Sequence, residues 1–158
     1  MNFSDFICFD ALVPEIQSED RDGTISEMIN ALDRSGKIPK GLAPKIIRAV
    51  IERENEASTG MGKGIAVPHV KHSAIKEALG TVGLQTTAGL DFSSLDKQPV
   101  FCVFLLLSPK DFPEKHLQAM ETIFKHIQQE KFRKFLRQCK TAYEIEDLLK
   151  EADTITDW

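Results

Sequence analysis

The chain has 158 residues, 42% of them hydrophobic and 28% charged, and a formal net charge of −4 at pH 7. This is the composition of an ordinary globular protein, and the length predicts a single domain over residues 1–158. The acidic balance argues against nucleic acid as a partner, because phosphate binding normally shows as a basic excess.

The sequence also indicates in which cellular compartment the protein lies. The first residues lack the positive and apolar regions of a signal peptide, and the longest apolar run is far too short to span a bilayer. Cys8, Cys102 and Cys139 are widely spaced and odd in number, which is typical of reduced, buried thiols rather than of a disulfide framework or a zinc site. We therefore expect a cytoplasmic protein without direct membrane insertion.

Two helices are predicted in the first third of the chain. The apolar residues of the first helix recur at helical spacing and stop before Gly36, which suits a helix end. They are Ile25, Met28, Ile29 and Leu32. The second helix is expected from Gly41 to Glu56, and its buried side comprises Leu42, Ile46, Ile47, Val50 and Ile51.

Three strands are predicted in the middle of the chain. The segment GIAVPH, residues 64–69, is expected to stop at Pro68, because proline cannot donate to a β-ladder. The segment GTVGLQTT, residues 80–87, is a second candidate strand. The segment VFCVFLLLS, residues 100–108, is almost continuously apolar, which indicates a central strand covered on both faces.

Three helices are predicted to close the chain. Pro109 and Pro113 bracket a turn into the first, whose inward side is expected to hold Leu117, Met120, Phe124 and Ile127. Two amphipathic helices follow, and the last begins with a capping box of Thr141 and Glu144. Helices thus precede, separate and follow the strands, which predicts an α/β layered domain.

The segment STGMGKGIAVPHVKH, residues 58–72, combines glycines with titratable groups. Lys63 is followed by Gly64 instead of Ser or Thr, so the segment is not a P-loop. It follows a helix and leads into a strand, which is the reverse of a dinucleotide fingerprint. Two interpretations stay open: a flexible connection, or a loop whose N–H groups bind an anion beside His69.

Two histidines lie in this segment. His69 follows Pro68, which fixes a backbone dihedral, and a neutral imidazole is a competent nucleophile near neutral pH. The alternative is an ordinary surface or hydrogen-bonded histidine. His72 completes an H-x-x-H spacing, but no cysteine or carboxylate follows at a suitable spacing for zinc, so no metal site is expected.

His116 lies just inside the helix that follows the strand of residues 100–108. Ligands of α/β proteins bind beyond the carboxyl ends of strands, so His116 can share a crevice with His69. Taken alone, the sequence favours a solvated helix position for His116. His126 offers less reason for a functional role.

Charged residues flank the same segment. Arg53 and Glu54 end the second helix, and both can be surface charges at a helix C-terminus. Alternatively, Arg53 is the bidentate partner of a phosphoryl group. Lys63 and Lys71 either add positive potential or are solvated side chains.

Together, RENEASTGMGKGIAVPH, LLLSP and HLQAM resemble the IIA component of the bacterial phosphoenolpyruvate-dependent sugar phosphotransferase system. The similarity is to the fructose–mannitol type, which includes nitrogen-branch regulatory paralogs, and it extends over nearly the whole chain. It implies the mannitol-type IIA fold, a mixed β-sheet flanked by helices on both faces.

The resemblance also implies a function. His69 accepts a phosphoryl group from the phosphocarrier protein HPr and passes it to a IIB component. Arg53 and His116 support the transfer, and neither a metal nor another cofactor takes part. The phosphoryl-binding loop comprises Ser58, Thr59, Gly60, Gly62 and Gly64.

Val70 departs from the family pattern, which commonly has glycine after the phosphorylated histidine. A β-branched residue restricts the backbone, so the loop shape or the docking of the carrier is expected to differ. Two further functions stay open. One is a regulatory protein whose phosphorylation state controls partner binding, and the other, less favoured, is a hydrolase with His69 and His116 as base and acid.

Overall fold

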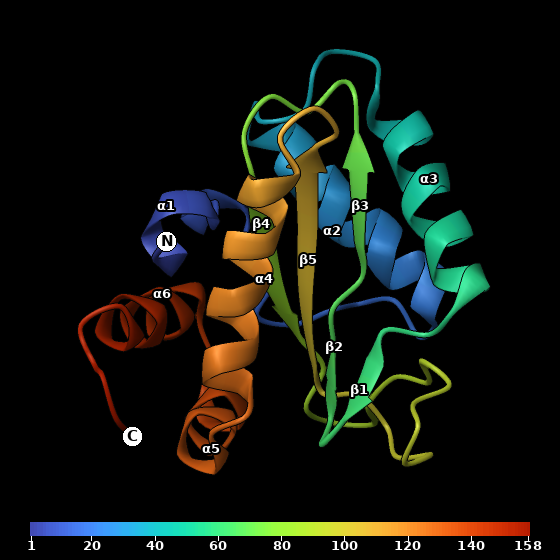
Figure 1. Ribbon diagram of the computed structural model, residues 1–158. Coiled ribbons are helices and arrows are strands. Elements are labelled where there is room, and N and C mark those ends of the chain that lie inside the picture. Colours follow the sequence, from blue (N-terminus) through green and yellow to red (C-terminus); the bar gives the residue numbers. More distant parts are fainter.

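The computed structural model describes residues 1–158 and contains one five-stranded mixed sheet with helices on both faces (Figure 1). The strands are β1 (Gly60–Gly62), β2 (Ile65–Ala66), β3 (His69–His72), β4 (Leu79–Leu84) and β5 (Cys102–Pro109). The helices are α1 (Phe3–Phe6), α2 (Arg21–Arg34), α3 (Ala43–Glu56), α4 (Pro113–Ile127), α5 (Glu130–Gln138) and α6 (Ala142–Ala152), with a 3₁₀ helix, η1, at Phe9–Ala11. The predicted α/β layered architecture is confirmed.

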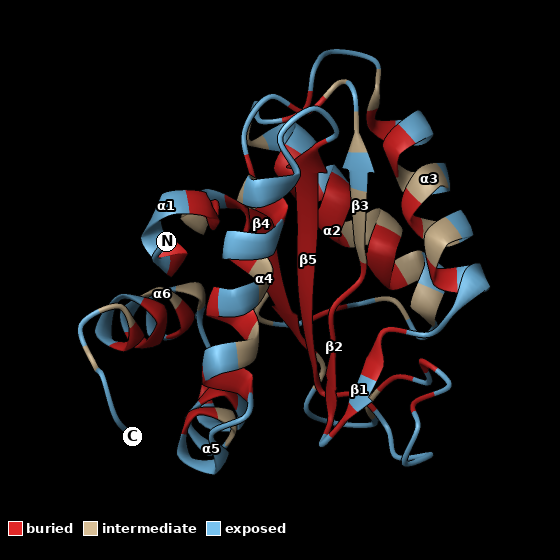
Figure 2. Ribbon diagram, in the orientation of Figure 1, coloured by how far each residue is buried: buried red, intermediate tan, exposed pale blue.

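The central strand is β5, as its apolar sequence predicts. All eight of its residues are buried, and Figure 2 shows the strand in the colour of buried residues along its length. It pairs in parallel with β2 and β3 along one side and antiparallel with β4 along the other. A continuous run of apolar residues suits this position, because helices cover both faces of the sheet.

Pro68 lies between β2, which ends at Ala66, and β3, which starts at His69. Ile65 of β2 lies opposite Cys102 and His69 of β3 lies opposite Leu106, so one register continues through the proline. The proline lies beyond the end of β1, where no neighbouring strand needs its N–H, and its carbonyl accepts a hydrogen bond from the Leu106 N–H at 3.0 Å. As expected, β2 ends before Pro68, but the same register resumes beyond the proline, so His69 lies in the strand β3.

The helices cover the sheet in two groups. One face packs against α2 and α3, and its buried cluster includes Ile29, Ile46 and Val103. The other face packs against α1, α4, α5 and α6, and its buried cluster includes Phe3, Phe104 and Ile123. Because successive residues of a strand point to opposite faces, β5 contributes alternately to both clusters.

The glycine segment forms an ordered hairpin of β1 and β2. Its turn holds Lys63 and Gly64 at positive φ angles of 60° and 81°. A Cβ atom at Gly64 would lie 2.4 Å from the Phe101 ring, and the Lys63 N–H donates to the Asp96 carboxylate at 3.0 Å. The expectation of a loop is therefore wrong for residues 60–62, which form β1, and glycine at position 64 serves the turn and close packing.

The helix after β5 is rotated relative to the prediction. Leu117, expected inside, is 62% exposed, whereas His116 is 7% exposed. The buried side of α4 includes His116, Ala119, Ile123 and Ile127, and Met120 and Phe124 lie partly buried beside it. Apolar periodicity alone misplaces this face, because a histidine occupies one of its core positions.

The other predicted features are close to the observed ones. Gly36 follows the end of α2 at a φ of 75°, and the three cysteines are buried and unpaired. Thr141 caps α6, since its hydroxyl accepts a hydrogen bond from the Glu144 N–H at 3.2 Å. The short helix α1 is not predicted by periodicity. None of the helices combines the length and apolar character needed to cross a bilayer.

Candidate functional site

His69 begins β3, on the face of the sheet that α4 covers. Its register partner is Leu106, which belongs with Val67 to the buried cluster beneath α4. Val70 points to the other face and packs at the margin of the α2–α3 cluster. A β-branched residue suits extended backbone, so the strand accommodates the restriction expected from Val70.

One hydrogen bond fixes which ring nitrogen of His69 carries the hydrogen. Nδ1 lies 2.7 Å from the carbonyl oxygen of Val67. A carbonyl oxygen only accepts, so Nδ1 donates, and this assigns the neutral ring an unprotonated Nε2 with a free lone pair. That tautomer is the one required of a nucleophile that reacts through Nε2.

Burial favours the neutral form of His69. The pKa of the ring is lowered from 6.5, mainly by burial, while the hydrogen bond to Val67 raises it. The charges of Arg53 and Lys71 lower the pKa further, and the Glu54 carboxylate raises it. A lowered imidazole pKa means that the nucleophilic, unprotonated form predominates at neutral pH.

His116 lies beside His69. Helix α4 starts just beyond the carboxyl end of β5, and the two ring centroids are 5.3 Å apart with 42° between the ring planes. The structure thus brings the two histidines together as predicted. The alternative of a solvated helix position for His116 is wrong, because its side chain is buried between α4 and the sheet.

His116 is also neutral at pH 7. Its pKa is lowered to about 4 by burial and, to a smaller extent, by the positive charges that His69 and Lys71 can bear. Its Nδ1 atom lies 2.7 Å from the hydroxyl oxygen of Ser108, near the end of β5. Ser108 was not among the predicted site residues, although the hydroxyl that ends an apolar strand is visible in the sequence.

Arg53 lies half-buried at the C-terminal end of α3. One of its Nη atoms donates to the Ala57 carbonyl oxygen at 3.1 Å, and the guanidinium charge lies close enough to lower the pKa of His69. The other guanidinium N–H groups donate to no protein atom and remain free for an anion. Lys71 points to the same face as His69, whereas Lys63 lies at the hairpin turn.

Glu54 is a buried residue that the sequence interpretation treats as a surface charge. It is 2% exposed, and its carboxylate accepts hydrogen bonds from the Thr59 N–H at 2.6 Å and the Thr59 hydroxyl at 2.7 Å. The sequence contains the signal, because Ile46, Val50 and Glu54 recur every four residues on one side of α3. Glu54 anchors the segment that leads from α3 into β1.

The predicted phosphoryl-binding loop divides into two parts. The first part, Ser58, Thr59 and Gly60, lies near the start of β3, since the Thr59 carbonyl accepts a hydrogen bond from the Val67 N–H at 3.2 Å. The second part, Gly62 and Gly64, belongs to the hairpin. The extended chain from Gly64 to His69 spans roughly 15 Å, which places this part out of reach of a phosphoryl group on His69.

The other two histidines have local structural partners. His72 points to the face opposite His69, and its Nδ1 accepts a hydrogen bond from the Ala74 N–H at 3.0 Å. His126 is buried and accepts a hydrogen bond from the Trp158 indole at 3.0 Å. Neither lies beside the pair formed by His69 and His116.

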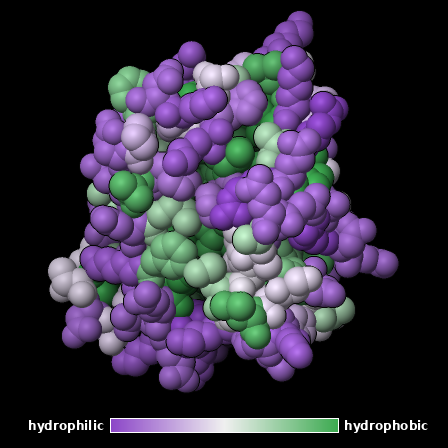
Figure 3. Space-filling model, turned by 45° about the vertical axis from the view of Figure 1, so that its right-hand side comes forward, coloured by the Kyte–Doolittle hydropathy of each residue, from purple (hydrophilic) through white to green (hydrophobic).

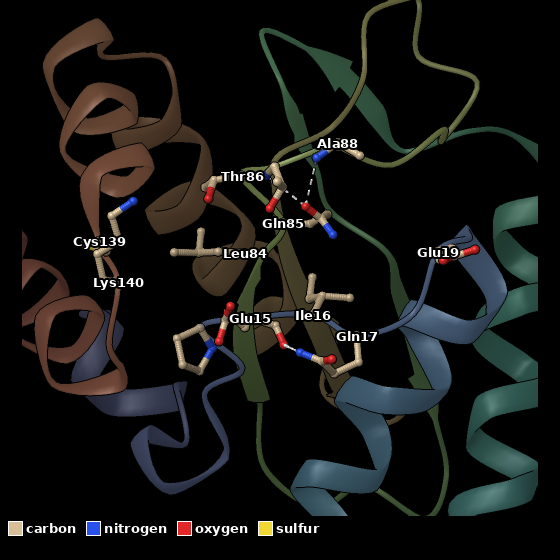
Figure 4. Close-up of a pocket in the computed structure, with 13 residues that line it drawn as sticks. Glu15, Ile16, Gln17, Glu19, Leu84, Gln85, Thr86, Ala88, Cys139 and Lys140 are labelled. Carbon is tan, nitrogen blue, oxygen red and sulfur yellow. Dashed lines mark hydrogen bonds between the residues drawn. The ribbon is translucent and has the colours of Figure 1, made fainter.

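A groove of about 810 Å³ lies elsewhere, beyond the end of β4, with Glu15, Gln17 and Gln85 in its wall (Figure 4). It contains no histidine, and burial raises the pKa of its one thiol, Cys139, to about 11. No group of three or more His, Cys, Asp and Glu side chains lies close enough together to hold a metal ion.

The sequence matches one protein family over residues 10–152. The family is described as "Phosphoenolpyruvate-dependent sugar phosphotransferase system, EIIA 2". The match contains every residue of the site described above.

Three relatives illustrate the range of this similarity. The fructose-specific EIIABC component of Bacillus subtilis (strain 168) is 32% identical over 138 residues, which cover 87% of this chain but only 21% of that protein. The fructose-specific EIIA component of Haloferax volcanii is 30% identical over 132 residues, 83% of each chain. A nitrogen regulatory protein of Bradyrhizobium diazoefficiens is 27% identical over 150 residues, 94% of this chain and 95% of that protein.

Solved structures share the fold. Nitrogen regulatory protein IIA-Ntr of Neisseria meningitidis matches with a TM-score of 0.81 at 24% identity, over 91% of this chain and 96% of that chain. The complex of IIA mannitol with phosphorylated IIB mannitol from Escherichia coli matches with a TM-score of 0.75 at 16% identity, over 90% and 95%. The mixed sheet flanked by helices on both faces is thus the mannitol-type IIA fold.

Proposed function

Because this chain belongs to the EIIA 2 family of the phosphoenolpyruvate-dependent sugar phosphotransferase system, we propose that it accepts a phosphoryl group on Nε2 of His69 and passes it to a second protein. The family makes the chain a phosphotransfer component of that system. The choice of the accepting atom rests on the hydrogen bond between His69 Nδ1 and the Val67 carbonyl, which leaves Nε2 unprotonated.

In the proposed reaction, Nε2 of His69 attacks the phosphorus atom presented by the phosphocarrier protein HPr. The Nε2–P bond forms as the bond from phosphorus to the donor breaks, and the donor atom keeps the electron pair. No general base is needed, because Nε2 has no hydrogen to lose. The Nδ1–H group remains bonded to the Val67 carbonyl, which stabilises the positive charge that develops on the ring.

Arg53 and His116 are proposed to bind the phosphoryl oxygens. The free N–H groups of the Arg53 guanidinium suit two oxygens at once, and the neutral ring of His116 supplies one N–H donor. Binding must stay moderate, because a phosphohistidine that is held too firmly is not passed on.

The surface next to the pair supports a protein partner. Phe112 and Leu117 stand on either side of His116 in the sequence and are 50% and 62% exposed. Figure 3 shows apolar patches within a largely hydrophilic surface, and exposed apolar groups of this kind are typical of protein contacts. We propose a IIB component as the acceptor, and the cytoplasm as the place of transfer.

A regulatory function is the second candidate. It is favoured by the nitrogen regulatory relative, whose similarity extends over 94% of this chain. In this case His69 is still phosphorylated, but the phosphorylation state controls the binding of other proteins.

The test is incubation with phosphoenolpyruvate, Enzyme I and HPr, followed by intact-mass measurement. We expect one acid-labile, alkali-stable phosphoryl group on the wild type and on His72→Ala, and none on a folded His69→Ala. Subsequent loss of the label to an added IIB supports transport, whereas stable, state-dependent capture of another protein supports regulation. Normal labelling of His69→Ala would show that another residue is the acceptor.

A further inference from the structure

Ser108 places a hydroxyl group inside an otherwise apolar strand. The residue is 0% exposed, and the strand residues before it, Cys102–Leu107, are buried and apolar. A buried hydroxyl without a hydrogen bond costs stability, so its partner explains why it is tolerated. The one partner of the Ser108 hydroxyl is Nδ1 of His116, at 2.7 Å.

The direction of this hydrogen bond follows from the groups present. If Nδ1 of His116 carried the hydrogen, the Ser108 hydroxyl would accept it and would need another acceptor for its own hydrogen. The Ser108 Oγ atom makes no hydrogen bond to any other acceptor. The hydroxyl therefore donates to Nδ1, which assigns the ring hydrogen of neutral His116 to Nε2.

The same contact places the ring relative to His69. Leu106 lies opposite His69, and Ser108 follows two positions later on β5, so all three side chains point to the face beneath α4. Ser108 binds the Nδ1 edge of the His116 ring, so the Nε2 edge is not held by Ser108, and the centroid of the ring lies 5.3 Å from that of His69.

We infer that Ser108 is a positioning residue for phosphoryl transfer: its hydroxyl holds His116 in the tautomer and orientation in which Nε2–H donates to the phosphoryl group on His69. Ser108 itself does not touch the phosphoryl group. The inference rests on the proposed function of His69, and it concerns the tautomer and orientation of the His116 ring beside His69.

The first test is NMR of the imidazole nitrogens of the unphosphorylated protein. We expect long-range ¹H–¹⁵N correlations of His116 typical of the Nε2–H tautomer in the wild type, and a shift toward a mixture of tautomers in Ser108→Ala. A wild-type ring with the hydrogen on Nδ1, or an unchanged His116 signal in Ser108→Ala, would overturn the inference. This arm requires no phosphoryl donor, so it is independent of whether HPr phosphorylates His69.

The second test is a double-mutant cycle on the rapid-quench rate of transfer from HPr. Loss of one hydrogen bond predicts that Ser108→Ala slows transfer about three- to tenfold. In a His116→Ala background, the same substitution should cause no further loss, because Ser108 acts through His116. Equal slowing in both backgrounds would contradict a positioning role.

Thr81→Val is the matched control. Thr81 lies on β4, is also 0% exposed, and donates its hydroxyl hydrogen to the Ala11 carbonyl at 2.8 Å. It lies opposite Leu105, on the face of the sheet that α2 and α3 cover, so loss of its hydroxyl should lower stability without slowing transfer. Slow phosphoryl transfer by the Thr81→Val variant would mean that loss of any buried hydroxyl disturbs the site. This result would refute the specific role of Ser108. A wild type that HPr does not label contradicts the proposed function instead.

Discussion

The reactivity of His69 depends on its two ring nitrogens having different neighbours. Nδ1 is held by the Val67 carbonyl, and Nε2 is left with a free lone pair, which we propose as the acceptor of the phosphoryl group. His116 has the complementary arrangement, since its Nδ1 is occupied by Ser108. Burial lowers the pKa of both rings, so both are neutral at pH 7, and His69 then has a free lone pair while His116 has one N–H group.

Arg53 should matter through the shape of its guanidinium as well as its charge. A charge-assisted hydrogen bond contributes about 1.5–3 kcal/mol, so we expect Arg53→Gln to lose tenfold or more in transfer rate, on the order of that energy. Arg53→Lys keeps the charge but not the bidentate geometry and should recover only part of the rate. Rapid-quench transfer from HPr measures both variants. Equal transfer rates in the wild type and both variants would show that Arg53 takes no part in transfer and is only a surface charge at the end of α3.

His116 should contribute to transfer more than to carrier binding. The hydrogen bond that it donates gains strength as charge redistributes on the phosphoryl group, so His116→Ala should still be labelled at His69, but slowly. His116→Gln retains an N–H donor and should be less impaired. Transfer rates as a function of HPr concentration separate the maximal rate from binding. If His116→Ala matches the wild type while His72→Ala fails, His72 is the second histidine of the site.

At the scale of elements, the site depends on the pairing of β3 with β5. The shared register through Pro68 sets His69 opposite Leu106, and α4 returns over the same face to deliver His116. The hairpin of β1 and β2 extends the same sheet away from the site. Its glycines therefore have a structural explanation that is independent of phosphoryl binding.

Substitution of Gly62 separates these two roles. Gly62 has a φ of 86°, and an added Cβ would lie 3.3 Å from an Asp96 carboxylate oxygen. Gly62→Ala should lower the free energy of unfolding by about 1–2 kcal/mol through the left-handed backbone, while the folded protein keeps the wild-type transfer rate. Urea unfolding and rapid-quench transfer measure the two effects.

Gly36→Ala provides the matched control for Gly62→Ala. Gly36 has a φ of 75°, no neighbouring atom within 4 Å of an added Cβ, and a position after α2 far from His69 in the chain. It should lose a similar amount of stability and no transfer rate. If folded Gly62→Ala transfers slowly while Gly36→Ala transfers at the wild-type rate, the hairpin takes part in phosphoryl binding after all.

Elements with strong local patterns could be predicted from the sequence. The apolar run of β5 and the periodicities of α2 and α3 fix their type and place, and the resemblance supplied the sheet around them. The return to the same register with β5 beyond Pro68 could not be predicted, because it depends on the absence of a neighbouring strand that would need the missing N–H. Periodicity mispredicts which side of α4 is buried, because His116 lies on that side and bonds to Ser108 of β5.

The residues of the site differ in how far the sequence alone reveals them. His69 stands out through the Pro-His pair, and its proximity to His116 follows once α4 is known to begin at the carboxyl end of β5. Ser108 could not be recognised in the same way, because its importance lies in a contact across the sheet–helix interface. Glu54 was detectable from its spacing in α3, but a carboxylate is rarely expected in a core.

At the scale of the whole molecule, buried histidines couple the site to stability. His69, His116 and His126 all have lowered pKa values, with burial as the main cause. His126 lies in the interface that joins the first residues to the C-terminal helices, where the Asp153 carboxylate also accepts a hydrogen bond from the Phe3 N–H at 2.6 Å. Protonation of these rings is therefore disfavoured in the folded state.

The consequence is a defined loss of stability on the acid side. The pKa of His116 is 6.5 in the unfolded chain and about 4 in the folded protein, so the unfolded state binds more protons between these values. The free energy of unfolding should therefore fall as pH decreases from 6.5 toward 4, with His116 contributing at most about 1.4 kcal/mol per pH unit. Above pH 6.5 its contribution is constant.

Replacing His116 with glutamine isolates its share of this effect. His116→Gln removes the titrating group, so its free energy of unfolding should fall less steeply between pH 6.5 and 5 than that of the wild type, whatever its absolute stability. Asp96 does not interfere, because its pKa is lowered from 3.8 and its stabilising contribution is lost only at lower pH. Urea unfolding at half-unit pH intervals measures both slopes. Parallel slopes in the two proteins would mean that His116 titrates normally in the folded state, and the neutral donor proposed beside His69 would then be untenable at mildly acidic pH.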